Sequence, residues 1–275
     1  MLRVTTMSRI LQFYLRTSMG LKRFLCGIMH RIIIRRYKGS DVVFLNYGYE
    51  YLDSDKEPPQ LEENDEKERY CLQLYHTTVG GIDLENKDVL EIGCGRGGGA
   101  SYIKRYLKPK SYIGLDMSKD VIKFNSKFHK VPGLSFVEGN AQDIKYEDQS
   151  FDAIVNVESS RSYNDFEAFV SESYRVLRPG GHLLFTDIRT TEENEILREQ
   201  FKKAGFKILK EENIIQNVVK ALDIDSERRL KLMKEKAPKI IHGVAEEFSS
   251  TKGSKRYQEF ADGTQIYLQY ILQKE

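Results

Sequence analysis

Short apolar runs separated by longer amphipathic stretches repeat through the middle of this chain. The apolar runs, whose lengths suit buried strands, lie at 89–92, 111–116, 134–138, 151–157 and 182–187. Stretches with helical patterning lie between most of them, at 100–107, 118–129 and 165–177. Strands and helices that alternate in this way call for parallel strands joined by right-handed crossovers. The pattern therefore predicts an α/β fold with a doubly wound, mostly parallel sheet.

The pattern differs on both sides of this region. A helix is predicted at 67–79, ending at Gly80-Gly81, and the acidic stretch before it, with Pro58-Pro59, reads as a loop. The segments predicted after the fifth strand are a helix at 191–204, an alternating strand at 206–215, a charged helical run at 227–239 and an alternating strand at 263–273.

The strand at 89–92 runs into a stretch in which five of the seven residues from Gly93 to Gly99 are glycine. Each glycine costs roughly 0.5–1 kcal/mol relative to alanine in regular structure, so packing alone does not favour this composition. Glycine permits positive φ and lets a ligand approach the main chain. The helix that follows presents unpaired N–H groups and a partial positive charge. We therefore interpret this stretch as a ligand-binding loop rather than a merely flexible one.

The spacing of Gly93, Gly95 and Gly98 satisfies the G-x-G-x-x-G dinucleotide fingerprint, which is a weak signal by itself. The discriminating residue is Glu91, two positions before the first glycine. A carboxylate there would repel a pyrophosphate on the same loop, whereas it would suit a ligand that carries a cationic amine.

Polar residues also follow the neighbouring strands. Asp116 ends the second strand, 21 residues beyond Gly95, where a carboxylate can accept hydrogen bonds from both ribose hydroxyls. Asn140 follows the third strand and Glu158 follows the fourth. Ligands of doubly wound sheets bind at the carboxyl ends of the strands, so we expect one pocket to hold these residues.

Composition narrows the class of protein. The chain has 275 residues, is 40% hydrophobic and carries a net charge of +2, which does not favour nucleic-acid binding. Its three cysteines are far apart and form no C-x-x-C pair. This usage argues against a disulfide framework or a metal site, and it favours a reducing, cytoplasmic compartment.

Residues 1–38 differ from the rest, with nine Lys/Arg and no acidic residue. Their apolar stretches are too interrupted to span a bilayer, which needs about 20 apolar residues. The segment reads as an amphipathic helix on a membrane or lid surface, a transit peptide, or an ordinary packed helix. Peripheral membrane contact follows from the first reading only. We expect residues 39–275 to form a single domain.

With Glu91, the glycine stretch resembles the E-x-G-x-G-x-G signature of class I S-adenosylmethionine-dependent methyltransferases. The resemblance covers about 39–272 and is similar in detail to the bacterial phthiotriolone/phenolphthiotriolone dimycocerosate methyltransferases. It is carried by VVFLNYGYE, LYH, VLEIGCGRGGGASY, YIGLDMS, VPGLSFVEGNA, SFDAIVNVESS and RVLRPGG. The family implies a seven-stranded Rossmann-like fold with a helical lid and an antiparallel C-terminal edge. It also implies O-methylation of a hydroxyl on a lipid, with S-adenosylmethionine and no metal.

The resemblance assigns residues to the cofactor. Those expected to contact it are Glu91, Gly93, Cys94, Gly95, Gly97, Asp116, Met117, Asn140, Ala141 and Asn156. Two positions depart from the family. Asn140 replaces a common aspartate but can still face an adenine amino group. Arg161 replaces a histidine, and an arginine cannot accept a proton at pH 7.

A hydroxyl acceptor needs a base, and two candidates are available. His76 lies on the helix before the first strand, a segment that folds over the cofactor in this family; it can equally be a core histidine. Glu158 is the second candidate, although it can instead bind the amine end of the cofactor. The four aromatic residues of 39–51 suit either a core or a wall over a cofactor pocket. We expect a small-molecule, apolar substrate to lie beside the Tyr47 and Tyr49 segment.

The predicted function is O-methylation of a hydroxyl on a small apolar or lipid-like substrate by in-line transfer. The alternatives are N- or C-methylation of a small metabolite and non-catalytic binding of S-adenosylmethionine. A nicotinamide-dependent oxidoreductase would share the glycine loop, but Glu91 and the LRPGG turn argue against it.

Overall fold

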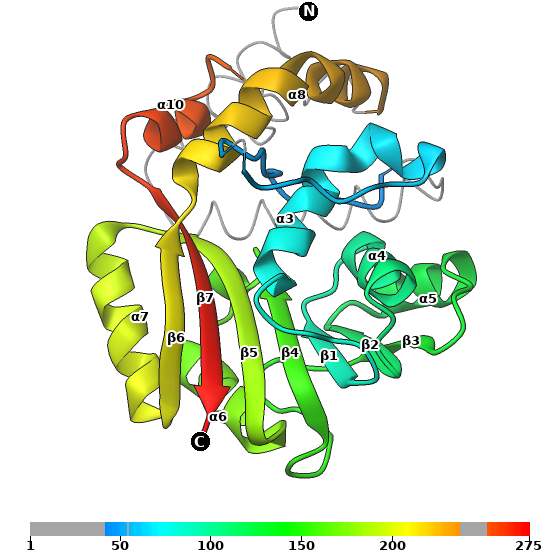
Figure 1. The fold of residues 1–275 in the computed structure, drawn as a ribbon, viewed down its shortest axis with the longest axis vertical. Coiled ribbons are helices and arrows are strands. Elements are labelled where there is room, and N and C mark those ends of the chain that lie inside the picture. The colour runs from blue at the N-terminus through cyan, green and yellow to red at the C-terminus, as the bar shows by residue number, and fades with distance from the viewer. Residues whose placement is uncertain (1–41, 54, 237–251) are drawn as a thin grey trace, which may run out of the picture.

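A computed structural model describes residues 42–53, 55–236 and 252–275. One seven-stranded sheet runs through it in the order β3-β2-β1-β4-β5-β7-β6 (Figure 1). The strands are β1 (Asp88–Ile92), β2 (Ser111–Asp116), β3 (Leu134–Glu138), β4 (Phe151–Val157), β5 (Leu177–Arg189), β6 (Phe206–Asn213) and β7 (Ile266–Lys274). The described helices are η1 (Glu63–Glu68), α3 (Arg69–Val79), α4 (Gly98–Tyr106), α5 (Lys119–Phe128), η2 (Ser160–Ser162), α6 (Phe166–Val176), α7 (Thr191–Lys203), α8 (Ile215–Lys236) and α10 (Lys255–Ala261).

The sheet is parallel from β3 to β5 and antiparallel at the β7 and β6 edge. Its strand order reverses between β1 and β4, where Glu91 lies between Gly114 of β2 and Val155 of β4. A reversal of this kind opens a crevice at the carboxyl ends of the two strands. The predicted doubly wound sheet with an antiparallel edge is confirmed.

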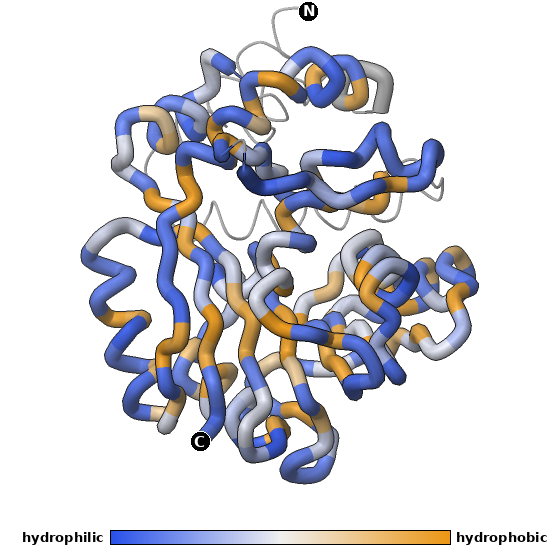
Figure 2. Tube along the Cα trace, viewed as in Figure 1, coloured by the Kyte–Doolittle hydropathy of each residue, from blue (hydrophilic) through white to orange (hydrophobic). Residues whose placement is uncertain are grey.

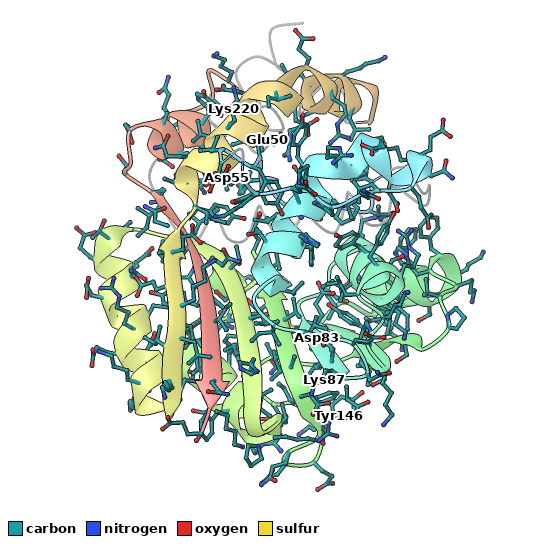
Figure 3. The ribbon with its side chains drawn as sticks, in the orientation of Figure 1. Glu50, Asp55, Asp83, Lys87, Tyr146 and Lys220 are labelled. Carbon is teal, nitrogen blue, oxygen red and sulfur yellow. The ribbon has the colours of Figure 1, made fainter. Side chains whose placement is uncertain are left out.

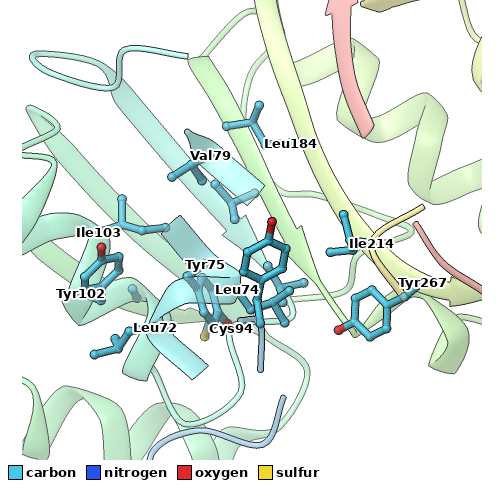
Figure 4. Packing of buried hydrophobic residues seen from close by; sticks show 14 of the residues in the cluster. Leu72, Leu74, Tyr75, Val79, Cys94, Tyr102, Ile103, Leu184, Ile214 and Tyr267 are labelled. Carbon is cyan, nitrogen blue, oxygen red and sulfur yellow. The ribbon is translucent and has the colours of Figure 1, made fainter. Parts of the chain in front are cut away.

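Side chains on both faces of the sheet are apolar, because each face is covered. One core contains Val89, Val155 and Leu184 with residues of α3, α4 and α8. The other contains Leu90 and Ile154 with residues of α6 and α7. Figure 2 shows apolar residues along the central strands and polar residues on the outer turns of the helices, and Figure 4 shows the first core from close by.

Helix starts agree with local sequence signals. The Ser118 and Asp165 side chains accept hydrogen bonds from N–H groups of the first turns of α5 and α6. Thr190 and Glu193 form a reciprocal capping box at α7. Helix α4 is different, because its N-cap is Gly97, which lies within the glycine stretch and has the left-handed conformation.

A cap covers the carboxyl edge of the sheet (Figure 1). It consists of residues 42–53, η1, α3, α8 and α10. The N–H of Tyr49 donates to the carbonyl of Tyr70 on α3, and Glu50 exchanges hydrogen bonds with Asn217 on α8. In Figure 3 the labelled Glu50 and Lys220 lie at the cap, whereas Lys87 and Tyr146 lie toward the other end of the sheet.

Element boundaries differ from the prediction by one to three residues at several places and by more, or in kind, at the following three. β5 begins at Leu177 rather than 182, because Leu177 pairs with Phe151 before a register shift in β4. The helix expected at 227–239 begins at Ile215, so its described part, Ile215–Lys236, is longer than its charged portion suggests. The acidic stretch read as a loop contains η1, whose first turn is rich in acidic residues.

Residues 1–38, with the predicted basic helix, lie outside the described residues. Within the described ranges, we find no helix that combines the length and the apolar character needed to cross a membrane.

Candidate functional site

The glycine stretch turns sharply between β1 and α4. The N–H groups of Gly93 and Cys94 both donate to the carbonyl of Leu115, which anchors the loop to β2. Gly93 has a φ of +77°, and a Cβ there would lie 2.4 Å from the Ser159 hydroxyl oxygen. Gly93 is therefore required by packing.

Gly95 is required for another reason. Its φ is +49°, yet a Cβ built there would meet no atom within 4 Å. Its N–H donates to Asp116 over 3.1 Å, and its carbonyl accepts from the buried Asn125 amide over 2.7 Å. The loop is thus held from both sides around an open space. A side chain would fill this space, which is the arrangement expected where a ligand contacts the main chain.

Glu91 lies beneath the loop and is fully buried. Its carboxylate accepts hydrogen bonds from the Tyr75 hydroxyl at 2.9 Å and the Tyr112 hydroxyl at 3.0 Å. Burial raises the pKa of Glu91 to about 7, the two phenol hydrogen bonds oppose the rise, and the nearby Asp116 adds to it. Each carboxylate oxygen retains acceptor capacity, and a cationic ligand above the loop would favour the ionised form.

Asp116 stands at the tip of β2. One carboxylate oxygen accepts from Gly95 N–H and the other from Ser118 N–H. Met117, the next residue, is 77% exposed, which is high for an apolar side chain beside a core strand. Of these two residues, Asp116 is the one that contacts the main chain at Gly95.

The other predicted cofactor residues lie nearby but are engaged differently. Cys94 is buried, and burial raises the pKa of its thiol well above the usual range. The exposed Asn140 accepts from the N–H of Gln142, which closes a turn beside the buried Ala141. Asn156 is fully buried and donates to the carbonyl of Ile92, where the glycine stretch begins. The side chains of Cys94 and Asn156 therefore shape the loop from within the protein.

Glu158 follows β4 directly and has a φ of +50°, in the left-handed region that residues with a Cβ seldom adopt. Its Oε1 accepts from the N–H of Tyr47 at 2.8 Å and from the Tyr267 hydroxyl in a short hydrogen bond. Among the described residues, no hydrogen bond to its Oε2 is found. Burial raises the pKa of Glu158 to about 7, while the two hydrogen bonds oppose the rise. The strained backbone and the single occupied oxygen keep Glu158 a candidate functional residue.

The cap holds the Tyr47 end of this arrangement. The Arg229 guanidinium on α8 donates to the carbonyls of Asn46 and Tyr47 at 2.9 and 3.0 Å, and it pairs with Asp225 at 3.0 Å. The Tyr47 ring packs edge-on against Phe260 and Tyr267. These three rings therefore form an aromatic cluster beside Glu158 that is part of the core, since Phe260 and Tyr267 are fully buried. The other reading of the sequence, an aromatic wall over a pocket, stays a prediction.

His76 faces a different environment. Its Nδ1 lies 2.8 Å from the Tyr102 hydroxyl on α4, and its ring packs edge-on against the same residue. Burial lowers the pKa of His76, so the neutral form is favoured. Tyr75, one position earlier, points to the site instead, since it binds Glu91 and its pKa is raised in part by Glu158. The structure thus places Glu91, Tyr75 and Glu158 together and turns His76 toward α4.

Arg161, where the family resemblance led us to expect a histidine, links neighbouring elements through hydrogen bonds. Its guanidinium donates to the carbonyl of Ile188 at 3.0 Å and to the Gln265 side chain at 3.1 Å. These bonds tie the turn after β4 to β5 and to the start of β7.

Tyr75, Tyr112 and Tyr267 were missed as site residues in the sequence. All three are buried and donate to a site carboxylate. Tyr112 occupies an apolar strand position, where a phenol reads as core. The only sequence signal for Tyr75 was its place in the LYH motif beside His76. The prediction chose His76 from this motif, because histidine is the more common catalytic base.

The electrostatics of the site suit a cation. Glu91, Asp116 and Glu158 are carboxylates at the carboxyl ends of three adjacent strands. The charge of Asp116 contributes to the raised pKa of Glu91. A ligand with a positive charge above the loop would relieve this repulsion, and the open space at Gly95 gives it room.

Comparison with known families gives a direct match. Residues 90–185 match the model of a methyltransferase domain. This range runs from within β1 to within β5 and contains the residues described above from Glu91 to Arg161.

Two relatives match nearly the whole chain. A fatty-acid O-methyltransferase of Mycolicibacterium smegmatis is 39% identical over 250 residues, covering 90% of this chain and 89% of the relative. A phthiotriol/phenolphthiotriol dimycocerosates methyltransferase of Mycobacterium tuberculosis is 34% identical over 247 residues, covering 89% and 90%.

Solved structures share the fold. A cyclopropane synthase of Mycobacterium tuberculosis aligns with a TM-score of 0.64 at 18% identity, over 89% of this chain and 98% of that one. A geranyl diphosphate C-methyltransferase of Streptomyces coelicolor, solved with S-adenosyl-L-homocysteine, aligns with a TM-score of 0.58 at 15% identity, over 90% and 97%.

Proposed function

Because this chain belongs to the family of S-adenosylmethionine-dependent methyltransferases, we propose that it methylates a hydroxyl oxygen of a lipid-like substrate. The names of both relatives refer to lipid substrates, which supports the substrate class. The observation that carries the choice of a hydroxyl is Glu158. It is a carboxylate with a pKa raised to about 7, and one of its oxygens accepts no hydrogen bond from the described residues.

The residues around the glycine loop fit the cofactor. The main chain at Gly95 leaves room for it, and the carboxylates of Glu91 and Asp116 would favour its cationic and hydroxyl groups. When bound, S-adenosylmethionine supplies a methyl group already activated by a sulfonium. The work of the protein is therefore to align the acceptor and to remove its proton. Alignment alone can contribute several kcal/mol, up to about 7–11 in ideal cases.

Glu158 is proposed as the general base. An alcohol is a poor nucleophile at pH 7, so its O–H proton has to leave as the new C–O bond forms. The Oε2 of Glu158 would take this proton while Oε1 stays bound to the Tyr267 hydroxyl and the Tyr47 N–H. A positioned base of suitable pKa contributes roughly 10²–10⁴-fold. His76 stays a weaker candidate, because its Nδ1 is paired with Tyr102.

An apolar acceptor suits the surroundings of Glu158. The rings of Tyr47, Phe260 and Tyr267 pack against one another beside it, at centroid distances of 5.2 to 6.5 Å. Phe260 and Tyr267 are fully buried and Tyr47 is partly exposed, so an apolar chain would contact this cluster through Tyr47, whereas a small charged metabolite would gain little from an aromatic surface.

The test compares two acceptors of equal chain length, hexadecan-1-ol and hexadecanoic acid, with methyl-labelled S-adenosylmethionine. The proposal predicts the labelled methyl ether. Label in the methyl ester alone would overturn the hydroxyl, and it would favour carboxylate methylation, the second candidate suggested by the name of the M. smegmatis relative. A carboxylate is already ionised at pH 7 and needs no base, so this outcome would also remove the role of Glu158.

Peripheral membrane contact through residues 1–38 is part of the proposal, supported by their nine Lys/Arg and lack of acidic residues. The protein should then sediment with anionic vesicles, and salt should release it, because screening acts within about 8–10 Å. Equal binding to neutral vesicles, or no binding, would contradict it.

A further inference from the structure

One buried hydroxyl outside the methyltransferase motifs reaches the proposed base. Tyr267 is on β7, 109 residues from Glu158, and its side chain is fully buried. Its hydroxyl donates to Glu158 Oε1 (for its position in the core see Figure 4). A phenol buried in a core usually finds a partner, but this partner is a carboxylate in a strained backbone position.

We infer that Tyr267 is a positioning residue that fixes Glu158 through Oε1, so that Oε2 is the atom that accepts the substrate proton. The inference rests on the proposed role of Glu158 as a base. A carboxylate that is free to rotate would present either oxygen, whereas this one is held at Oε1 by a phenol and a main-chain N–H.

Tyr267 itself is fixed from several sides. It pairs with Ile188 in the β5–β7 register, and its carbonyl accepts from the N–H of Ile214 at 2.7 Å. Its ring packs edge-on against Tyr47 and Phe260. The hydroxyl therefore has a defined location before any substrate arrives, which is the requirement for positioning a catalytic group.

The Glu158 side chain is not fixed by the hydrogen bonds of its own main chain. Its φ of +50° is unfavourable for a residue with a Cβ. The main-chain N–H is bonded to the carbonyl of Thr186 at 2.8 Å, which fixes the Cα but leaves the side chain able to turn. The bonds from Tyr267 and Tyr47 supply the remaining restraint.

Other charged and titratable groups also face Glu158. Asp187 on β5 raises its pKa, Arg229 on α8 lowers it, and Tyr75 on α3 is close enough for its own pKa to be raised by Glu158. The hydrogen bond from Tyr267 favours the ionised carboxylate. Removing it should therefore raise the pKa of Glu158. Since the base acts when ionised, the rising limb of the activity profile should move to higher pH.

The experiment compares Tyr267→Phe with Tyr270→Phe. Tyr270 lies on the same strand, is equally buried, and donates to Asn194 at 2.5 Å on the other face of the sheet. Each variant loses one buried phenol oxygen from β7, so Tyr270→Phe controls for the loss of stability that such a change causes. Methyl transfer to hexadecan-1-ol is measured from pH 5.5 to about 9, together with S-adenosylmethionine affinity by calorimetry.

For Tyr267→Phe we expect turnover at pH 7 to fall about tenfold and the rising limb to move up by about half a unit or more. Cofactor affinity should stay within about twofold of wild type, and Tyr270→Phe should change neither quantity. An unmoved limb, or an equal loss in both variants, would overturn the inference.

Glu158→Gln separates this inference from the proposed function. If that variant keeps wild-type turnover, the proposed base is wrong and the inference falls with it. If it loses turnover while Tyr267→Phe behaves as wild type, the base stands and only the inference is overturned. If both the proposed base and the inference are correct, adding Tyr267→Phe to Glu158→Gln should lower turnover by less than about twofold further, because the two residues act as a unit.

Discussion

The cofactor side and the cap side of this molecule are built in different ways. The cofactor side consists of β1, β2, the glycine stretch and Asp116, which lie within 30 residues of one another. We expect its contacts with the cofactor to be made largely by main chain. The cap side brings Tyr47, Glu158, Arg229 and Tyr267 together from four distant parts of the chain. There the proposed role in catalysis belongs to a side chain, that of Glu158.

This difference separates binding from chemistry. Main-chain contacts at the glycine stretch can recognise one cofactor with any acceptor. Glu158 and the side chains around it can be substituted without disturbing that recognition, and we expect them to determine which acceptor reacts. We therefore expect substitutions on the cofactor side to change cofactor affinity, and substitutions on the cap side to change turnover or acceptor affinity.

The largest effect is expected from Gly95→Val. The space beside Gly95 is open, so the fold should survive, but the side chain would occupy the place of the ligand. S-adenosylmethionine affinity should fall about 100-fold or more, or about 3 kcal/mol, in calorimetry. Gly180→Val is the control, because Gly180 also has positive φ and open space but lies near the start of β5. Equal affinity in the two variants would place the cofactor elsewhere.

Asp116→Asn should have the next largest effect. It keeps an acceptor for one main-chain N–H but removes the negative charge at the tip of β2. A hydrogen bond to a charged group is worth about 1.5–3 kcal/mol, so the dissociation constant should rise roughly 10- to 100-fold. Asp143→Asn removes an exposed charge paired with Lys145 and should leave the constant unchanged. An Asp116→Asn protein that binds as wild type would exclude the carboxylate from the contact.

Arg229→Met tests the cap side. The guanidinium holds the carbonyls of Asn46 and Tyr47, and its loss should loosen the segment that donates to Glu158. The acceptor KM should rise about tenfold, while cofactor affinity stays within about twofold. Arg228→Met is the matched control, because Arg228 bonds to the same Asp225 and to Glu68 but not to residues 42–53. A drop in cofactor affinity instead would show that the two sides are not separate.

His76→Gln should have the smallest effect. Glutamine can still bond to the Tyr102 hydroxyl, and the proposed base is Glu158. Alcohol turnover should change by about threefold or less. A fall of about 100-fold with unchanged cofactor affinity would instead make His76 the base, as one reading of the sequence held.

The sequence predicts the cofactor side better than the cap side for a physical reason. The strands at 111–116, 134–138 and 151–157 have the predicted bounds, because each is an apolar run bounded by turns or charges. Gly95 and Asp116 belong to one local motif, so spacing is enough to relate them. Glu158 was also named as a candidate, since it follows a strand at the same edge, and its role stays a prediction.

The partners of these residues were not predictable in the same way. Tyr75 and Glu91 are 16 residues apart, and Tyr267 and Glu158 are 109 apart, so no local pattern joins them. Each tyrosine also fits an apolar core by composition. His76 was preferred over Tyr75 because of its chemistry, although a turn of about 100° per residue on a helix gives adjacent positions different faces. Tertiary packing decides which of them faces the site.

The most direct test of this account is one set of measurements on Glu158→Gln. The variant keeps the shape of the side chain and its acceptor for Tyr267 and Tyr47 but cannot take a proton at pH 7. The account predicts S-adenosylmethionine affinity within about twofold of wild type and transfer to hexadecan-1-ol lowered by about 100-fold or more at saturating cofactor. Wild-type transfer to the alcohol, or a parallel loss of cofactor affinity, would contradict it.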